Sequence, residues 1–356
     1  MKNDLPEVPL QLLKKLYKTL GIKGISPEQT TVQIELAGLC SANCEFCDWT
    51  RRPKEQKIFM DTELAKKCVR EAKELKVSQI SFHVTGEPLD HPDILDIIPH
   101  DYPIVISTNC LSLENSLARE LSHMDNLLII LAVLWSEPKE RRERSIANAK
   151  AYLDLNPNNR NIFLQMICSE HAVQYSSLMY ETFSPYLKQL PGLQLHYKQP
   201  YTQEPERPTL GYIPANIPMK RDRRVQIDYM PTPQSCGPDC LAFAPNPSTD
   251  IIIQSDGQIK PCFKRWPYWN LGNIKDTTLA EVKMSKRLKE IRDIWCTGDP
   301  DNKLACHDCI RMAVPRGEPV WWSAEASGKP PSKLNRDQIM RSGDTIPSSE
   351  KYRLAK

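Results

Sequence analysis

The sequence predicts an α/β fold in which a parallel sheet of six strands is followed by a smaller, cysteine-rich region. Between residues 31 and 198, short apolar runs of strand length alternate with longer segments of helical period. After about residue 200, proline and polar residues replace this alternation. Strands that alternate with helices form parallel βαβ units, and such sheets bind their ligands at the carboxyl ends of the strands.

The elements of the sheet region follow from these patterns. Strands are expected at residues 32–36, 80–84, 104–107, 127–134, 162–167 and 193–197. Helices are expected at residues 61–76, 138–155 and 177–190. Asp61 is suited to be the N-cap of the first helix, and Pro185 is expected to break or kink the third.

The cysteine-rich region contains a predicted hairpin and a predicted helix. A Ser255-Asp256-Gly257 turn separates residues 250–254 from residues 258–260, which is typical of two antiparallel strands. A helix is expected over residues 278–295. From about residue 323 the chain is polar and contains proline, which predicts a loose tail.

Composition narrows the class of protein. Of the 356 residues, 40% are hydrophobic, which is enough for a packed core. The 47 basic and 44 acidic residues give a net charge of only +3, which argues against a dedicated nucleic-acid-binding protein. The first residues lack the apolar stretch of a signal peptide, and no run approaches the roughly 20 apolar residues of a membrane helix. We therefore expect a cytoplasmic protein without a membrane partner.

The twelve cysteines of the chain are clustered, which in a reducing compartment indicates metal binding rather than disulfides. Cys40, Cys44 and Cys47 directly follow the first expected strand. Thiolates favour zinc or iron–sulfur clusters. A structural zinc takes four ligands, and no fourth cysteine or histidine lies just beyond Cys47. Three ligands suit a cubane cluster with one open iron, and a zinc loop is the alternative.

The Cys-x3-Cys-x2-Cys spacing, with Phe46 before the third cysteine, resembles the signature of the radical S-adenosylmethionine superfamily. The resemblance implies a partial (β/α)6 barrel that holds a [4Fe–4S] cluster with an open site for S-adenosylmethionine. It also implies an external one-electron reductant such as flavodoxin or ferredoxin. In that superfamily the reduced cluster splits S-adenosylmethionine, and a 5′-deoxyadenosyl radical then abstracts hydrogen from the substrate.

Two further segments, each following an expected strand, resemble parts of the S-adenosylmethionine site in that superfamily. Thr85-Gly86-Glu87-Pro88 looks like the glycine–glutamate motif that receives the methionine amino group, where glycine permits a close approach of the backbone. Ser107-Thr108-Asn109 resembles a segment near the ribose. The next residue in that segment is usually glycine, and this chain has Cys110 instead.

Other side chains near the expected strand ends are weaker candidates. Ser136 and Arg144 resemble residues that hold the methionine carboxylate, although Arg141 and Arg142 compete with Arg144, and surface charge on a helix is the simpler interpretation of any one of these arginines. Cys110 and Cys168 follow the third and fifth strands. Either thiol could return a hydrogen atom to a substrate radical, while packing as small apolar side chains is the simpler interpretation of both.

The C-terminal cysteines, the hairpin and the helix after it resemble the SPASM/twitch extension of the superfamily. Because no cysteine follows Cys309, the chain resembles the shorter twitch form with one auxiliary [4Fe–4S] cluster. The expected ligands are Cys240, Cys262, Cys306 and Cys309. Cys236 could replace Cys240, Cys296 is spare, and a four-cysteine zinc site is the competing interpretation.

The resemblance divides the chain into four parts: a helical extension at 1–30, the partial barrel at 31–200, the auxiliary-cluster domain at 201–322 and the tail at 323–356. We expect a radical enzyme that modifies a small molecule or a peptide by oxidation, epimerisation or a related reaction. Only about 30 residues precede the first strand, which mildly favours a small molecule over a peptide that needs a recognition domain. The alternative is an electron-transfer or zinc protein without radical chemistry.

Overall fold

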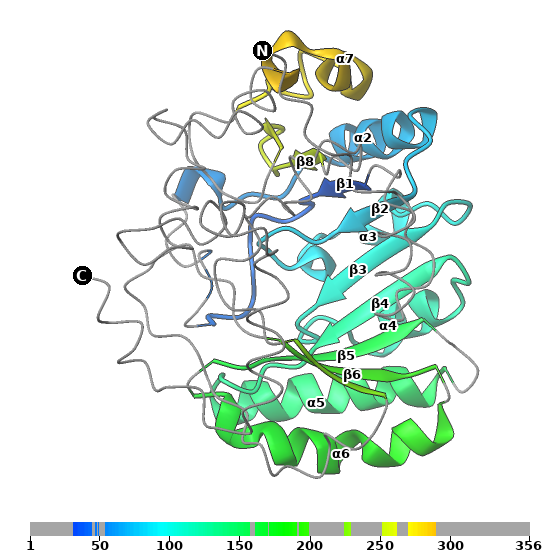
Figure 1. Cartoon of the computed structure of the whole chain (residues 1–356), viewed down its shortest axis with the longest axis vertical. Helices are drawn as coiled ribbons and strands as arrows, with labels where there is room; N and C mark the ends of the chain where they lie inside the picture. The colour runs from blue at the N-terminus through cyan, green and yellow to red at the C-terminus, as the bar shows by residue number, and fades with distance from the viewer. Residues whose placement is uncertain are drawn as a thin grey trace, which may run out of the picture.

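The computed structural model describes residues 31–44, 47, 49, 54–156, 161–169, 171–190, 192–198, 224–228, 251–261 and 270–289, with the backbone alone at 198 and 226–228. Within these residues the chain forms a nine-stranded sheet in the order β7-β6-β5-β4-β3-β2-β1-β8-β9. The helices follow the sheet in chain order, from α2 beside β1 to α6 beside β6 (Figure 1). The predicted α/β class is confirmed.

Six parallel strands form the centre of the sheet. They are β1 Thr31–Ile34, β2 Gln79–Phe82, β3 Ile104–Thr108, β4 Leu127–Ala132, β5 Ile162–Ile167 and β6 Gln194–Lys198. Every residue of β3 is buried, whereas buried and half-buried residues alternate along β4 and β5. These apolar runs form strands because the covering layers remove their side chains from water. All six predicted strands are confirmed, with ends that differ by at most about two residues.

Three strands extend the sheet at its two edges. β7 (Val225–Asp228) pairs in parallel with β6 and was not predicted, because its four residues lie in a polar, proline-rich stretch. The predicted hairpin is confirmed as β8 (Ile251–Ile253) and β9 (Ile259–Lys260), joined by a turn in which Gly257 has a φ of +89°. β8 also pairs in parallel with β1, so the hairpin continues the central sheet.

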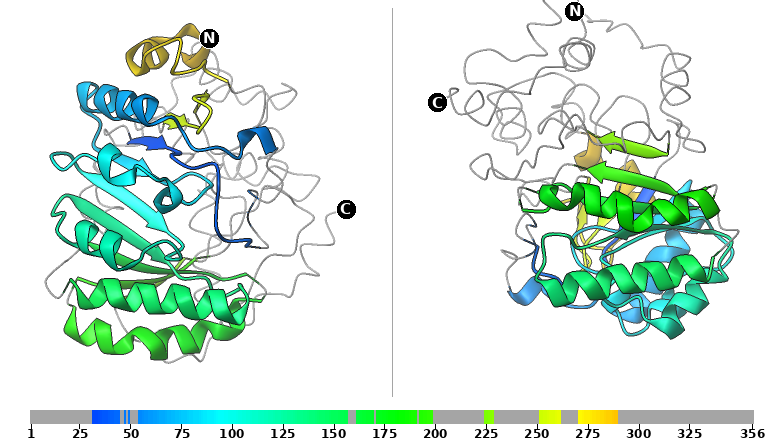
Figure 2. Two further views of the ribbon diagram at one scale, coloured as in Figure 1. Left: turned by 180° about the vertical axis from the view of Figure 1, so that it is seen from behind. Right: turned by 90° about the horizontal axis from the view of Figure 1, so that it is seen from below.

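The helices lie between the strands as the pattern indicated. They are α2 Thr62–Glu74, α3 Ile94–Ile97, α4 Asn115–Ser122, α5 Lys139–Asp154 and α6 Ser176–Gln189, with short 3-10 turns at Lys54–Gln56, Pro88–Asp90 and Val173–Tyr175. Asp61 is the N-cap of α2, and its carboxylate accepts a 2.9 Å hydrogen bond from the Leu64 amide. Helices α5 and α6 lie side by side at one end of the sheet (Figure 2).

Two helix predictions can be compared in detail. Helix α6 continues through Pro185, so the expected break does not occur there, and the alternative of a kink stays a prediction. Proline leaves the Glu181 carbonyl without its usual amide partner, and the Ser184 hydroxyl donates to that carbonyl at 3.3 Å. The helix expected over 278–295 is interrupted at Ser285, whose ψ of 140° ends α7 (Leu279–Met284). The Ser285 hydroxyl accepts from the Leu288 amide and starts a second helical segment at residue 286.

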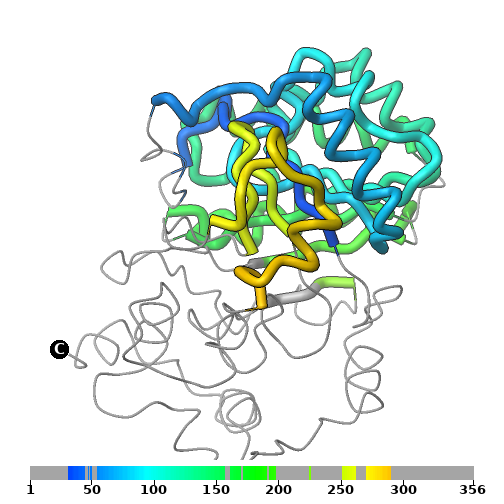
Figure 3. Tube along the Cα trace, turned by 90° about the horizontal axis from the view of Figure 1, so that it is seen from above, coloured from blue at the N-terminus to red at the C-terminus, as the bar shows by residue number. Residues whose placement is uncertain are grey.

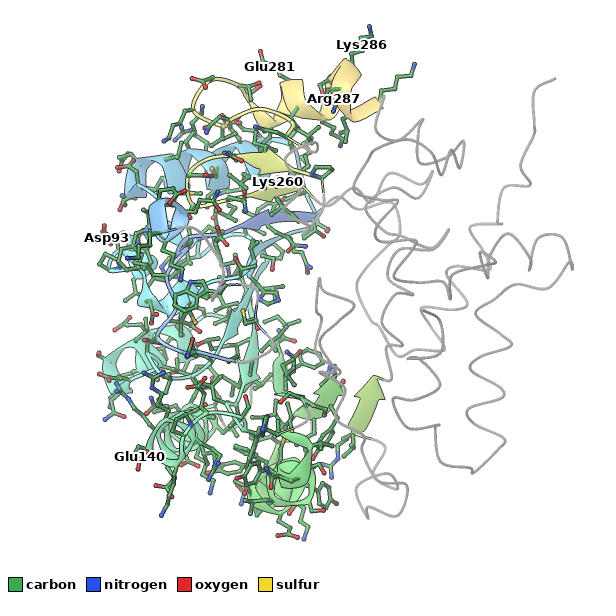
Figure 4. All side chains as sticks on the ribbon, turned by 90° about the vertical axis from the view of Figure 1, so that its left-hand side faces the viewer. Asp93, Glu140, Lys260, Glu281, Lys286 and Arg287 are labelled. Atoms are coloured by element: carbon green, nitrogen blue, oxygen red, sulfur yellow. The ribbon has the colours of Figure 1, made fainter. Side chains whose placement is uncertain are left out.

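The hairpin and α7 share the core of the central sheet. Ile251, Ile259 and Leu279 belong to the same cluster of buried apolar side chains as β1 and α2. Viewed from above, residues 251–261 and 270–289 lie across the β1 end of the sheet (Figure 3). Lys260 and Glu281 mark this end in Figure 4. The described part of the predicted auxiliary domain is therefore packed directly on the predicted barrel.

Several predicted features cannot be compared with the structure. The helical extension at 1–30 and the tail at 323–356 lie outside the described residues, as do Phe46 and the six C-terminal cysteines. None of the described helices has the length and apolar character that crossing a membrane requires. The division of the chain into domains stays a prediction.

Candidate active site

The N-terminal cysteines lie on the loop that follows β1, at the carboxyl edge of the parallel sheet. Cys40, Cys44 and Cys47 are all half-buried. The first two pack against a small apolar cluster formed by Ala42, Leu111 and Leu134. The Cys47 amide donates to the Cys44 carbonyl at 3.0 Å, which makes a tight turn between the second and third cysteines. The sequence thus places this loop where sheets of this type bind ligands.

The surroundings of these thiols disfavour their ionised form. Burial raises the pKa of Cys40 to about 12, with a further contribution from the nearby Glu87 carboxylate. Burial also raises the pKa of Cys44 well above its usual range, and Cys47 and Glu137 add to the effect. Metal ligation needs thiolates, so bound iron would have to supply the positive charge that stabilises them.

The donor chemistry and the placement of this loop fit an iron–sulfur cluster, although the loop is not closed around a single metal ion. The thiols lie close together, since Cys47 raises the pKa of Cys40, and Cys47 and Cys40 both raise the pKa of Cys44. Among the described residues, no group of three His, Cys, Asp or Glu side chains is arranged to hold one ion. The fit therefore rests on the three sulfur donors and on the loops packed around them.

Gly86 brings the loop after β2 against the chain that leads to Cys40. The Glu87 amide donates to the Leu39 carbonyl at 2.9 Å. A Cβ atom at Gly86 would lie 1.6 Å from the Ala37 carbonyl oxygen and 2.6 Å from that of Leu39. Because both neighbours are backbone atoms, only glycine permits this approach. The predicted reason for a glycine in this motif agrees with the contact observed.

Glu87 points its carboxylate toward the end of β3 and is only 2% exposed. One carboxylate oxygen accepts from the Asn109 amide at 2.6 Å and the other from the Leu89 amide at 3.1 Å. Burial raises the pKa of Glu87 to about 7, and these hydrogen bonds oppose the rise. The Thr108 side chain also forms a hydrogen bond to this carboxylate, which has about four lone-pair sites and can therefore still accept from a cationic ligand.

Asn109 connects the predicted ribose segment to the first cysteine. Its side-chain amide donates to the Cys40 sulfur at 3.5 Å. Its side-chain oxygen accepts from the Leu111 amide, and its carbonyl accepts from the Ser145 hydroxyl, both at 2.8 Å. These contacts fix the orientation of the amide. Such a donor stabilises negative charge on a ligating sulfur.

Cys110 adopts the backbone conformation that glycine favours. Its φ is +66°, in the left-handed region. The main chain thus keeps a glycine-like course at the position where the resemblance expects glycine. The thiol is fully buried in the core, and burial raises its pKa well above its usual range.

Replacing Cys110 by glycine is expected to change the free energy of unfolding by no more than about 1 kcal/mol, because relief of the left-handed conformation offsets the lost burial of the thiol. Replacing it by valine should cost about 2 kcal/mol or more, since a β-branched residue at positive φ is strongly strained. Urea denaturation of the two variants beside the wild type measures the difference. Equal stability of the two variants would contradict the assigned conformation.

Cys168, the other predicted hydrogen donor, lies in the core. Its side chain is 0% exposed, and its sulfur is 3.8 Å from the Met166 carbonyl oxygen. Burial raises its pKa to about 12. The structure thus places Cys168, like Cys110, among packed apolar side chains, and the hydrogen-donor role of either thiol stays a prediction.

The two predicted carboxylate-binding residues differ in their exposure to solvent. Ser136 is half-buried just after β4, whereas Arg144 is exposed and pairs with Glu114 on the surface. Arg141 pairs with Glu137 at 3.2 Å, and the other oxygen of Glu137 accepts from the Asn43 amide at 2.9 Å. Arg141 is therefore the arginine of α5 that these contacts connect to the cysteine loop. The role of Arg144 stays a prediction.

Three buried or half-buried carboxylates around this loop were missed by the sequence reasoning. Glu137, at 5% exposure, holds the loop through Asn43. Asp90 accepts from the Ser41 amide at 2.8 Å and also contacts the Ser112 hydroxyl. Glu35 is 2% exposed directly after β1. Each lies at or just beyond an expected strand end, and that position was the only sequence pattern that could have indicated them.

The site thus combines three thiols, a buried glutamate and a fixed amide at the carboxyl edge of a parallel α/β sheet. This is the architecture that the predicted superfamily implies. Two comparisons with known proteins bear on that class, one from family models and one from solved structures.

Residues 240–310 match the SPASM family model, an iron–sulfur cluster-binding domain. The fold is similar to that of SuiB from Streptococcus suis bound to S-adenosylmethionine, with a TM-score of 0.58 and 15% identity over 80% of this chain and 72% of that one. It is also similar to native anSMEcpe with bound AdoMet and Kp18Cys peptide, with a TM-score of 0.51 and 17% identity over 75% of this chain and 83% of that one. A search of curated proteins finds no match.

The described residues therefore have a fold similar to that of two proteins solved with bound S-adenosylmethionine, and residues 240–310 match an iron–sulfur cluster-binding domain. The α/β fold and the C-terminal iron–sulfur domain that the resemblance implies agree with these two matches. The matched segment supports an iron–sulfur cluster in the C-terminal part of the chain. The choice between the SPASM and twitch forms stays a prediction.

Proposed function

We propose that this chain is a radical S-adenosylmethionine enzyme whose catalytic cluster is held by Cys40, Cys44 and Cys47. The observation that carries the proposal is the meeting of three loops at one edge of the sheet. The Glu87 amide binds the Leu39 carbonyl of the cysteine loop, and the Glu87 carboxylate binds the Asn109 amide. The cysteine thiols, the Glu87 carboxylate and the Asn109 amide follow three adjacent strands, β1, β2 and β3 respectively.

The chain's own residues would bind and orient the cofactors. When bound, a reduced cluster supplies one electron that splits the sulfonium carbon–sulfur bond, giving methionine and a 5′-deoxyadenosyl radical that takes hydrogen from the substrate. Glu87 would accept the methionine amino group, and Asn109 would hold the Cys40 sulfur while lying near the ribose. Ser136, with Arg144 or Arg141, would bind the methionine carboxylate of S-adenosylmethionine. The electron would come from a flavodoxin- or ferredoxin-like partner.

We further propose an auxiliary [4Fe–4S] cluster held by Cys240, Cys262, Cys306 and Cys309. All four fall within the matched segment 240–310, whereas Cys236 lies outside it. This supports Cys240 over its alternate. The proposed domain boundaries remain 31–200 for the barrel and 201–322 for the auxiliary domain. A reducing cytoplasm would keep such thiols available for clusters.

The substrate that we propose is a small molecule or a peptide, modified by oxidation, epimerisation or a related reaction. The peptide choice gains support from the solved structures, since SuiB is known bound to its precursor peptide SuiA and anSMEcpe with a Kp18Cys peptide.

The proposal that this chain is a radical enzyme can be tested without knowing the substrate. Anaerobically reconstituted protein with a strong reductant should release 5′-deoxyadenosine and methionine from S-adenosylmethionine. Intact S-adenosylmethionine would instead favour an electron-transfer or zinc protein.

The affinity for S-adenosylmethionine should rise with pH because of Glu87. With a pKa of about 7 the carboxyl group is mostly neutral at pH 6 and mostly anionic above pH 7, and only the anion attracts an ammonium group. Between pH 6 and 7.5 the affinity should increase by about eightfold, following the ionised fraction. Equilibrium dialysis at several pH values measures this. The Glu87→Gln variant should bind weakly and without this dependence, whereas a wild type with a flat profile would contradict the assignment.

A further inference from the structure

Glu35 is a buried carboxylate at the junction of three strands. It directly follows β1, and its side chain is among the most buried of the charged ones, at 2% exposure. Its amide donates to the Ile253 carbonyl of β8 at 2.8 Å. In Figure 1, β2 and β8 lie on the two sides of β1. The carboxylate therefore lies where the loops after all three strands begin.

The carboxylate binds the loops on both sides of β1. One oxygen accepts from the Thr85 hydroxyl of the loop after β2. The other accepts from the Ser255 amide at 3.1 Å and from the Ser255 hydroxyl at 3.3 Å, in the hairpin turn after β8. Hydrogen bonds to a charged group are stronger than those between neutral groups. Both loops are thus held to one side chain.

These two loops belong to different parts of the proposed enzyme. Thr85 directly precedes Gly86 and Glu87, which approach the cysteine loop. Ser255 lies inside the segment 240–310 that matches the iron–sulfur domain. A burial as deep as that of Glu35 is costly unless hydrogen bonds offset it, so the carboxylate holds both partners in a narrow set of positions.

The matched segment has two other anchors, both on helix α2, and their recorded hydrogen bonds do not include the Thr85 loop. The Lys67 ammonium of α2 donates to the Ile274 carbonyl at 2.5 Å. The Glu71 carboxylate, 9% exposed, accepts from the Leu279 amide at 2.7 Å and so holds the start of α7. Docking of the segment and placement of the Thr85 loop can therefore be separated by mutation.

We infer that Glu35 is a positioning residue for the S-adenosylmethionine site, because it holds Thr85, and with it Gly86 and Glu87, against the Ser255 turn of the matched iron–sulfur segment. The inference rests on the proposed function. It gives the hairpin a role in cofactor binding in addition to any role in holding an auxiliary cluster. A change at Ser255 should then be felt in S-adenosylmethionine affinity.

The test compares Glu35→Gln with Glu71→Gln in the anaerobically reconstituted protein. Both replace a buried carboxylate that anchors the matched segment, but only the first touches the Thr85 loop. Glu35→Gln should raise the dissociation constant of S-adenosylmethionine by about tenfold or more, since the amide has a single acceptor oxygen and cannot accept from both Thr85 and Ser255 as the two carboxylate oxygens do. Iron and sulfide content should equal that of the wild type. Glu71→Gln should lower stability without changing the dissociation constant.

Variants at the two partners make the test specific. Thr85→Val should weaken S-adenosylmethionine binding, and Thr85→Ser, which restores the hydroxyl, should recover most of the loss. If Glu35 links the loops, the double variant Thr85→Val with Ser255→Ala should raise the dissociation constant by less than the product of the fold-changes of the two single variants. Wild-type affinity in Glu35→Gln, or an equal loss in Glu71→Gln, would overturn the inference. If S-adenosylmethionine did not change the electron paramagnetic resonance spectrum of the reduced cluster in the wild type, the proposed function itself would be overturned. That result is distinct from failure of the Glu35 inference alone.

Discussion

Simultaneous replacement of Cys40, Cys44 and Cys47 by alanine is expected to lower the rate of S-adenosylmethionine cleavage by at least about 10³-fold. The three sulfurs are the proposed ligands of the cluster that passes the electron, and the other thiols in the described part of the chain, those of Cys68, Cys110 and Cys168, are buried in the core. Iron content should fall by about four per chain. Released 5′-deoxyadenosine and iron and sulfide contents measure the two effects.

Cys68→Ala is the matched control for the triple variant. Cys68 is fully buried on α2 and belongs to the hydrophobic core. Its loss should reduce stability by about 1 kcal/mol while leaving the cluster and the reaction intact. A triple variant that keeps its full iron content, or that still cleaves S-adenosylmethionine, would show that the cluster is bound elsewhere.

Gly86→Ala is expected to have the second-largest effect. The added Cβ would lie 1.6 Å from the Ala37 carbonyl oxygen, so the loop after β2 must move away from the cysteine loop. We expect the free energy of unfolding to fall by about 3 kcal/mol, at the upper end for overpacking, because the obstacle is backbone. S-adenosylmethionine binding should also be lost, because Glu87 moves with this loop. Urea denaturation and equilibrium dialysis measure the two results.

Gly272→Ala provides the comparison for Gly86→Ala. Gly272 has a φ of +119°, but a Cβ there would meet only a side-chain methyl of Thr277, at 3.7 Å. The free energy of unfolding of that variant should therefore fall only by the backbone strain of alanine at a positive φ, about 1–2 kcal/mol. The variant should bind S-adenosylmethionine normally. If Gly86→Ala were as stable as the wild type, the close approach of the two loops would be wrong.

The central sheet could be predicted because its information is local. Most strands of the central sheet are short segments rich in apolar residues, and the turn at Gly257 identifies the hairpin within a few residues. The partner of that hairpin could not be predicted. The pairing of β8 with β1 joins residues more than 200 positions apart, and no local pattern specifies it.

The site likewise contains some residues that local sequence predicts and others that only the assembled fold shows. The cysteine spacing and the Gly86-Glu87 motif are contiguous in sequence and were found there. The carboxylates that hold the loops act across long separations, as Glu35 does with Ser255 and Glu137 with Asn43. Single acidic residues at strand ends are common, so their partners become visible only when the strands are assembled. The ion pair between Arg144 and Glu114 could not be predicted for the same reason, because Glu114 lies at the start of a different helix, α4.

The most direct test of the account uses the electron paramagnetic resonance spectrum of the reduced catalytic cluster. The protein would carry Cys306→Ala and Cys309→Ala, which should remove the auxiliary cluster and leave only the cluster at Cys40, Cys44 and Cys47. Addition of S-adenosylmethionine should shift this spectrum, because one iron is open to the ligand beside Glu87. A cluster spectrum that S-adenosylmethionine leaves unchanged, or zinc without sulfide in the protein, would contradict the account.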